Sequence, residues 1–357
     1  LLNQAEHPCS ISSAARTICA NAPFLADYGH AWTAVTIKTE ENDTLDTEFA
    51  QASQAPSLET LNRYLSACPG EPDMGPLMGE APELKNYYVA AGFNSLGILL
   101  GGGVGQVMAQ WIVDGLPPID ISEVDIARML PFQNNPRYLR DRTVEALGLL
   151  YAQGYTNLQA ETARNVRKSP FHDRLRDQRA FFTDVSGWES PAWYAPEGHE
   201  PKVEKLSWGR QNWFPYWEAE HKACREAVIA MDMTFMGKFL VQGRDAGEFL
   251  NYVSANEVDG EAGMITYTQW LNHTGKLEAD LTVIKFDDEK YMVVATDTAH
   301  RHTEAWLKKN IGPGQHVFVT DVTAAYGQLN IQGPRSRELL QSLTTAYLSN
   351  EAFPFRG

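Results

Sequence analysis

The sequence is poor in cysteine and in positive charge. Its four cysteines, Cys9, Cys19, Cys68 and Cys224, lie far apart and include no C-x-x-C pair. This spacing predicts neither a zinc site nor a disulfide framework, and we expect no metal site. The formal net charge is −15, and no basic stripe with interleaved aromatic residues is present that could follow a phosphate backbone. Nucleic acid is therefore not expected as a partner.

Long apolar runs and a dinucleotide fingerprint are also missing. No window reaches the ~20 uncharged apolar residues that a bilayer span requires, so no membrane span is predicted. No G-x-G-x-x-G turn follows a strand near the start of the chain. The 357 residues are nevertheless 43% hydrophobic and 21% charged, which is typical of a globular protein with two or three domains.

A glycine-rich stretch, GFNSLGILLGGGVGQVMAQWIVDG, occupies residues 92–115. The preceding NYYVAAGF predicts a buried strand, and VGQVMAQWIVDG predicts an amphipathic helix with Met108 and Trp111 on its buried face. Glycines in the turn before that helix would let a ligand approach the backbone, next to unpaired N–H groups at the helix start. A tight contact between helix and sheet is the alternative explanation, and a glycine run alone favours it.

The last 140 or so residues are dense in strand-like runs separated by Gly, Asn and Asp turns. These runs are KFLVQG, MITYTQWLN, LEADLTVIKF, KYMVVAT, HVFVTDVT and YGQLNIQG, with helices expected near RDAGEFLNYVSAN, TEAWLKKN and PRSRELLQSLT. Short β-branched and aromatic runs mixed with helices predict an α+β fold with an antiparallel sheet.

One acidic residue stands in the middle of a predicted strand. A hairpin turn near Thr274 and Gly275 is followed by alternation that places Leu277, Leu281 and their neighbours on one face and Asp280 on the other. A solvated face of an antiparallel sheet is the ordinary explanation of such a carboxylate, and strand statistics alone favour it.

Three segments together resemble a known family. PDMGPLMGEAPELKNYYVAAGFNSLGILLGGGVGQVMAQWIVDG resembles the C-terminal end of the FAD domain of the sarcosine and dimethylglycine dehydrogenase family, which belongs to the glycine-oxidase-like flavoenzymes. RYLRDRTVEALGLLYA and GWESPAWYAPEG resemble that family's central segment. HKACREAVIAMDMTFMGKFLVQG and MITYTQWLNHTGKLEADLTVIKF resemble the folate-binding domain shared with the T-protein of the glycine cleavage system.

The resemblance implies a division of the chain into four parts. Residues 1–66 stay unassigned, 67–118 form the end of an FAD-dependent oxidoreductase domain, 119–200 form a central or linker segment, and 201–357 form an aminomethyltransferase-like folate-binding domain that is incomplete at its C-terminus. The expected fold class is therefore α+β, a remnant of a glycine-oxidase-like FAD domain followed by a T-protein-like domain. The aromatic stretch that begins at Ala180 is expected to be a linker that packs through aromatic contacts.

The resemblance also assigns cofactor-binding residues. The glycine-rich segment of the family lies beside the flavin, and we expect its site here to be incomplete because the pyrophosphate fingerprint is missing. The implied FAD-binding residues are Gly97, Ile98, Gly101, Gly102 and Gly103.

For tetrahydrofolate, the resemblance implies three residues. Asp280 matches the family's catalytic acidic residue, which contacts the folate nitrogen that receives the one-carbon unit. Tyr267 matches a tyrosine that lines the pterin pocket, although cross-strand packing would explain it equally well. Thr296 stands where the family often carries asparagine, a departure that weakens the expected folate affinity.

The function implied is FAD-dependent oxidative demethylation of an N-methylated glycine, sarcosine or dimethylglycine, with transfer of the one-carbon unit to tetrahydrofolate. An electron-transfer protein is an implied partner, and the implied location is the mitochondrial matrix in a eukaryote or the cytoplasm otherwise. Two alternatives stay open: a non-catalytic subunit related to the regulator of pyruvate dehydrogenase phosphatase, and an aminomethyltransferase-like folate-binding protein. The presence of Asp280 favours an enzyme.

Overall fold

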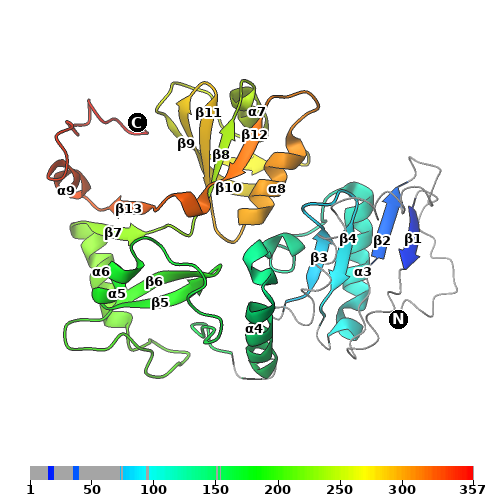
Figure 1. The fold of residues 1–357 in the computed structure, drawn as a ribbon, viewed down its shortest axis with the longest axis horizontal. Coiled ribbons are helices and arrows are strands. Elements are labelled where there is room, and N and C mark those ends of the chain that lie inside the picture. The colour runs from blue at the N-terminus through cyan, green and yellow to red at the C-terminus, as the bar shows by residue number, and fades with distance from the viewer. Residues whose placement is uncertain are drawn as a thin grey trace. The chain divides into compact units, whose positions relative to one another are not determined.

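The computed structural model describes residues 15–19, 35–39, 73, 75–93, 96–149, 152 and 154–356. The chain divides into two compact units, Leu1–Leu150 and Tyr151–Gly357 (Figure 1). Within residues 1–66 the described part consists of two strands, β1 (Ala15–Cys19) and β2 (Val35–Thr39), which pair antiparallel. Cys9 and Cys68 lie outside the described residues.

The first unit contains the predicted strand and the predicted helix. Strand β3 (Leu77–Glu80) pairs antiparallel with β4 (Tyr88–Ala91), and both precede helix α3 (Gly97–Asp114). The buried face of α3 presents Met108 and Trp111 to a cluster that includes Tyr88, as the hydrophobic pattern predicts. This helix contact gives the unit its main apolar core.

The helix begins earlier than the sequence suggests. Because α3 begins at Gly97, Gly101, Gly102 and Gly103 lie inside the helix and not in a turn before it. Glycine disfavours a helix by about 1 kcal/mol relative to alanine, which a packed apolar face can overcome. The expected glycine turn is therefore wrong, although the glycines do lie in the N-terminal half of the helix.

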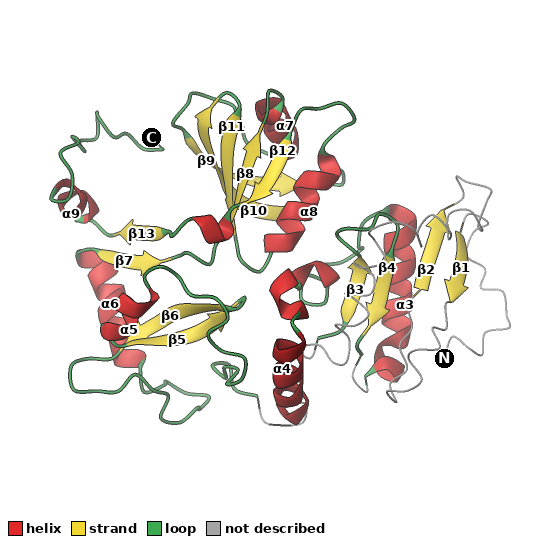
Figure 2. Cartoon of the chain, viewed as in Figure 1, coloured by secondary structure: helices red, strands yellow, loops and turns green. Residues whose placement is uncertain are grey.

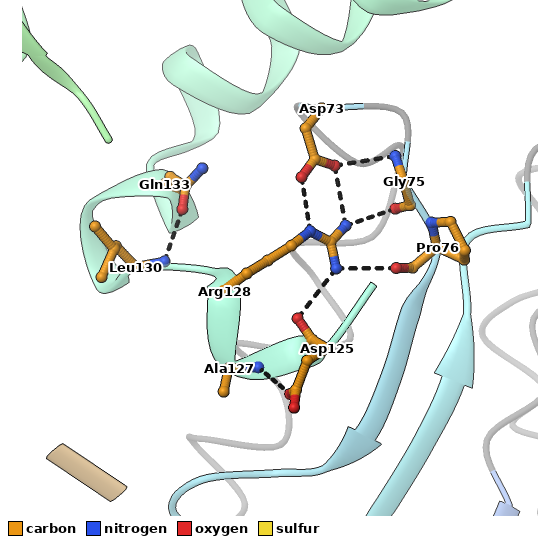
Figure 3. Close-up of polar contacts among 8 residues, drawn as sticks. All are labelled: Asp73, Gly75, Pro76, Asp125, Ala127, Arg128, Leu130 and Gln133. Carbon is orange, nitrogen blue, oxygen red and sulfur yellow. Dashed lines mark hydrogen bonds and ion pairs between the residues drawn. The ribbon is translucent and has the colours of Figure 1, made fainter. Parts of the chain in front are cut away.

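Arg128 joins two distant segments of the first unit. It ends the 3-10 helix η3 (Ile126–Arg128), which is followed by η4 (Pro131–Asn134) and α4 (Pro136–Leu149). Its guanidinium donates to both carboxylate oxygens of Asp73, at 2.7 and 3.0 Å, and to the carbonyl oxygens of Gly75, Pro76 and Asp125 (Figure 3). A planar fork of five N–H groups satisfies all of these acceptors at once, which an ammonium group cannot do.

We expect Arg128→Lys to lower the free energy of unfolding by about 1 to 3 kcal/mol, because partly buried carbonyl oxygens lose their donors. The matched control is Arg137→Lys on α4, whose side chain is 85% exposed and whose contact with Asp141 is 3.8 Å long. Urea titrations of both variants and the wild type measure the difference. Equal midpoints for all three proteins would contradict a stabilising role for Arg128.

The second unit contains a hairpin where a linker was expected. Helix α5 (His172–Asp177) leads into β5 (Ala180–Val185) and β6 (Trp188–Tyr194), which pair antiparallel, and α6 (Phe214–Glu226) follows. The expected aromatic packing is present, because the buried Trp193 stacks on Phe181 and on Trp213. Residues 180–194 are therefore a hairpin and not a linker, and its ladder has one register shift, between Phe181 and Phe182.

The rest of the second unit is built on a five-stranded antiparallel sheet (Figure 2). Its strand order is β12-β8-β11-β10-β9, with β8 (Gly237–Gln242), β9 (Ile265–Leu271), β10 (Leu277–Asp287), β11 (Lys290–Ala295) and β12 (Phe318–Asp321). The other elements are β7 (Ile229–Asp232), which pairs with β13 (Leu329–Gln332), and α7 (Ala246–Val253), α8 (His300–Asn310), η5 (Thr323–Ala325) and α9 (Ser336–Gln341).

One face of this sheet carries the core of the unit. Phe239, Val283 and Val293 from the strands form one buried cluster with Phe249 of α7 and Leu307 of α8. The α+β class with an antiparallel sheet is therefore confirmed. The opposite face, defined here by Tyr267, Asp280, Thr282, Val294 and Lys238, is called the outer face.

The alternation in β10 fails at its start. Leu277 is 61% exposed, although Ala279 and Leu281 are buried as predicted. The register with β9 shifts between Leu277 and Ala279, so a bulge reverses the direction of the side chains before it. The hairpin turn lies where the sequence places it, with Gly275 at a φ of 79°.

Candidate functional site

The strand register brings the outer-face residues into rows. Thr282 pairs with Tyr267 on one side and with Val294 on the other, and Val294 pairs with Lys238. Asp280 lies on β10 two residues before Thr282, so it shares the face. The predicted Tyr267 and Asp280 are therefore neighbours on one polar surface.

Tyr267 and Asp280 form a direct hydrogen bond. The Tyr267 hydroxyl donates to Asp280 Oδ2 at 2.8 Å. This bond is the main reason that the pKa of Tyr267 is raised, and the phenol therefore remains a donor at neutral pH. Among the described residues the Tyr267 hydroxyl is the only hydrogen-bond partner of the Asp280 side chain, which leaves Oδ1 open to a ligand.

Asp280 is exposed in the described structure, as a carboxylate on the solvated face of an antiparallel sheet would be. Its exposure follows from the sheet, because the helices that bury the other face do not cover Asp280. A carboxylate with one oxygen held and one free can accept a proton from an amine or stabilise an adjacent cation.

Thr296 lies at the same end of the sheet. It directly follows Ala295, which pairs with Leu281, and Leu281 directly follows Asp280. The loop after β11 is held by Asp297, which accepts a hydrogen bond of 2.7 Å from the Ser186 hydroxyl in the turn of the β5–β6 hairpin. The three residues predicted to contact folate thus come from three adjacent strands, Tyr267 and Asp280 from within β9 and β10 and Thr296 from just after β11.

The sequence analysis missed a partly buried polar network at the end of β12, where Asp321 pairs with the core residue Phe239. His300 Nε2 lies 3.1 Å from Asp321 Oδ2, and the Thr323 amide donates to Asp321 Oδ1 at 2.9 Å. Burial raises the pKa of Asp321, but the hydrogen bonds from His300 and Thr323 outweigh burial and hold the pKa well below its ordinary value. The D-x-T pattern after a strand, in which the carboxylate accepts from a backbone amide two residues on, could have revealed it.

This network predicts a specific acid sensitivity. A carboxylate whose pKa is lower in the folded than in the unfolded chain stabilises the fold above the unfolded pKa, about 3.9, and this contribution is lost as the pH falls. We expect Asp321→Asn to be less stable than the wild type at pH 7. As the pH falls below about 4, the variant should lose less stability than the wild type does, because it has no carboxylate to protonate at this position. Thermal unfolding across this range measures it.

The control for this prediction is Asp177→Asn, whose side chain is 70% exposed beside Arg176. Its stability should follow the wild-type dependence on pH. An acid transition in Asp321→Asn that is superimposable on the wild-type transition would contradict the role given to Asp321.

The glycines of α3 present bare backbone. Gly101, Gly102 and Gly103 are exposed, and a Cβ added to any of them meets no atom of the described residues within 4 Å. The close contact between helix and sheet is made by Gly79, where a Cβ would lie 2.2 Å from the Trp111 ring. The described packing therefore does not explain the three helical glycines.

The start of α3 is also suited to bind a negatively charged group. Gly97 is the first helical residue, Leu96 provides no side-chain cap, and the side chain of Ile98 is 85% exposed. Uncapped N–H groups and the positive end of the helix dipole suit a group with negative charge. These residues could hold a flat cofactor against the backbone, and their assignment to FAD stays a prediction.

Three models of known protein families match successive parts of the chain. The family model described as FAD dependent oxidoreductase matches residues 15–111, the FAD dependent oxidoreductase central domain matches 114–169, and the GCVT N-terminal domain matches 171–357. The last match covers more than half of the chain. The chain belongs to the GCVT N-terminal domain family. Its domain composition is that of the sarcosine and dimethylglycine dehydrogenase family, whose cofactors are FAD and tetrahydrofolate.

Three curated relatives illustrate the similarity. The chain is 40% identical over 293 residues to a formaldehyde-forming 4-methylaminobutanoate oxidase of Paenarthrobacter nicotinovorans, which covers 82% of this chain. It is 34% identical over 306 residues to the mitochondrial regulatory subunit of pyruvate dehydrogenase phosphatase of Mus musculus, and 32% identical over 344 residues to mitochondrial sarcosine dehydrogenase of Homo sapiens; these matches cover 84% and 85% of this chain. The chain spans 35 to 38% of the length of these relatives.

The matches confirm the order of FAD-dependent oxidoreductase, central and folate-binding segments. The oxidoreductase match begins at residue 15, inside the segment that the sequence analysis left unassigned, while the predicted domain boundaries stay a prediction. In the described residues, no helix is long and apolar enough to cross a membrane, and no cluster of acidic, histidine or cysteine side chains could hold a metal ion.

Proposed function

We propose that the chain is part of an enzyme that oxidises the N-methyl group of a small amino acid and passes the one-carbon unit to tetrahydrofolate. The observation that carries this proposal is the hydrogen-bonded pair of Tyr267 and Asp280 on the outer face of a GCVT-type sheet. An oxidoreductase match in the same chain supports the oxidative half. Sarcosine and dimethylglycine are the proposed substrates, because enzymes of that name share the domain composition.

The outer-face residues have defined roles in this proposal. Tetrahydrofolate, when bound, would supply a nitrogen nucleophile for the one-carbon unit, whose bond to the substrate nitrogen would break as the demethylated amine leaves. Asp280 accepts the proton that this nitrogen loses, through its open Oδ1, while Tyr267 holds Oδ2 and so fixes the plane of the carboxylate. Thr296 borders the same end of the face and offers a hydroxyl where an asparagine would offer an amide.

The first half of the chain has the complementary role. FAD, when bound, accepts the electrons removed from the N-methyl group. Gly101, Gly102 and Gly103 would let it lie against the helix backbone, and Gly97 and Ile98 would place the positive end of α3 beside its negative charge. An electron-transfer protein is the proposed partner, and the mitochondrial matrix is the proposed location if the organism is a eukaryote, as for the relatives named mitochondrial.

A second candidate is a regulatory role without catalysis. The 34% identity to the pyruvate dehydrogenase phosphatase regulatory subunit supports it as strongly as the 32% identity to sarcosine dehydrogenase supports an enzyme. The two candidates differ in what they require of Asp280. Only the enzyme needs that carboxylate to act on a folate nitrogen.

Titration of tetrahydrofolate into the protein by calorimetry tests the folate half. We expect Asp280→Asn to weaken binding by about 10- to 100-fold, since a charged hydrogen bond contributes roughly 1.5 to 3 kcal/mol. Tyr267→Phe should weaken binding less, by about fivefold, because it loosens the carboxylate without removing it. Asp287→Asn, an exposed aspartate at the other end of β10, is the control and should bind as the wild type does.

A wild type that does not bind tetrahydrofolate would contradict the catalytic proposal and favour the regulatory candidate. Wild-type binding that Asp280→Asn leaves unchanged would contradict the role given to Asp280.

The proposed contact of FAD with α3 predicts that one substitution raises stability and lowers FAD retention. Gly102→Ala should stabilise the protein without cofactor by about 0.5 to 1 kcal/mol, because alanine favours a helix and the site is open. The same methyl group should reduce the FAD retained after reconstitution, which flavin absorbance measures, because it separates the flavin from the backbone. Gly148→Ala on α4, another helical glycine with open space around it, should raise stability and leave FAD retention unchanged. Equal FAD retention by all three proteins would be evidence against flavin contact at α3.

A further inference from the structure

Lys238 is a buried cation on the outer face. Its neighbours in β8, Phe239 and Val241, point into the core of the sheet, so Lys238 points to the face that carries Tyr267. Only 2% of its surface is exposed. A lysine is almost never buried to this degree unless its ammonium group has partners.

The partners of Lys238 are two carbonyl oxygens of one loop. Its Nζ donates to Thr234 O at 2.9 Å and to Met236 O at 2.6 Å, in the residues that connect β7 to β8. The same loop is closed by a bond of 3.0 Å from the Met236 amide to Met233 O and by a bond from the Thr234 amide to Asp232 Oδ1. Lys238 therefore holds both carbonyls inward and fixes the conformation of the loop, which is called the 233–236 loop below.

Burial lowers the pKa of Lys238 to about 8, against the opposing effect of Asp321 and Asp232. The two bonds do not depend on this charge, because a neutral amine still has two N–H groups for two acceptors. The contact is thus suited to hold a loop in either protonation state.

The 233–236 loop ends beside the predicted folate residues. Met236 directly precedes Gly237, which pairs with Ala295, and Ala295 pairs with Leu281. Asp280 precedes Leu281 within β10, and Thr296 follows Ala295 at the end of β11, so the loop, Thr296 and Asp280 lie toward the same end of three neighbouring strands.

We propose that Lys238 is a positioning residue for the folate site, which acts by holding the carbonyls of Thr234 and Met236 and so fixing the 233–236 loop at the end of the sheet toward which Asp280 lies. This inference rests on the proposed function, because it assigns the ligand of the outer face to tetrahydrofolate. Lys238 itself need not touch the ligand. Without its donors, a buried carbonyl oxygen of Thr234 and a partly buried one of Met236 would lose their partner, and the loop would turn toward water.

The test compares two substitutions that differ in their donors. Lys238→Met keeps the length of the side chain and removes every donor, whereas Lys238→Gln keeps an amide group with two N–H donors. In titrations with tetrahydrofolate we expect the Kd of Lys238→Met to rise about tenfold and that of Lys238→Gln about threefold or less, since the amide restores part of the contact. Gln242→Met, an exposed change at the other end of β8, is the control and should leave the Kd unchanged.

The outcomes separate this inference from the proposed function. Equal Kd values for the wild type and Lys238→Met, or equal weakening in Lys238→Met and Lys238→Gln, would overturn the role of Lys238 alone. Absence of binding in the wild type and in Gln242→Met would overturn the proposed function, and this inference with it.

Hydrogen exchange on the wild type supplies a second measurement if Lys238→Met does not fold. Tetrahydrofolate should slow amide exchange at Met236 several-fold, because an ordered loop beside the ligand opens less often. Unchanged exchange at Met236 on saturation with tetrahydrofolate would show that the loop does not border the ligand, and would overturn the inference.

Discussion

The packing of α7 and α8 against one face of the five-stranded sheet determines the rest of the second unit. Phe239, Phe249, Leu250 and Leu307 have no exposed surface, and each fully buried side chain of this kind contributes roughly 1.5 to 3 kcal/mol. Because strand side chains alternate with a period of two, burying this set obliges Tyr267 and its neighbours to share the opposite face. A slip of one residue in any strand would turn the outer-face side chains of that strand inward and expose its core residues, so the apolar face fixes the polar one.

The alternation of apolar and polar residues allowed the strands and their two faces to be predicted from the sequence. The six β-rich runs each became a strand, and Asp280 is on the outer face where the pattern places it. The pattern could not predict that Tyr267 bonds Asp280, because that contact depends on the register between β9 and β10 and on the bulge after Leu277. Register is a tertiary property, determined by turn geometry and by packing rather than by local preference.

Two other features were beyond the reach of local patterns. Lys238 occupies an ordinary polar position in KFLVQG, and only the fold shows that its ammonium group is enclosed by Thr234 and Met236. The start of α3 at Gly97 was missed because glycine is a poor helix former, so propensity argued for a turn. In each case the deciding contact comes from residues packed around the element, which a single sequence does not display.

The edge position of β9 has a consequence for association of the protein with itself. An edge strand offers unpaired backbone groups to other chains, and such strands are sites of aggregation when they are left open. In β9 several of these groups are engaged: the side chain of Asn256 donates to Tyr267 O, the Ala255 amide donates to Gln269 O, and the Ile265 amide donates to Arg356 O. Because these backbone groups are already hydrogen-bonded, they are not available for β-pairing with another chain. The strand that carries Tyr267 can therefore leave its outer face open to a ligand without offering these groups at its edge.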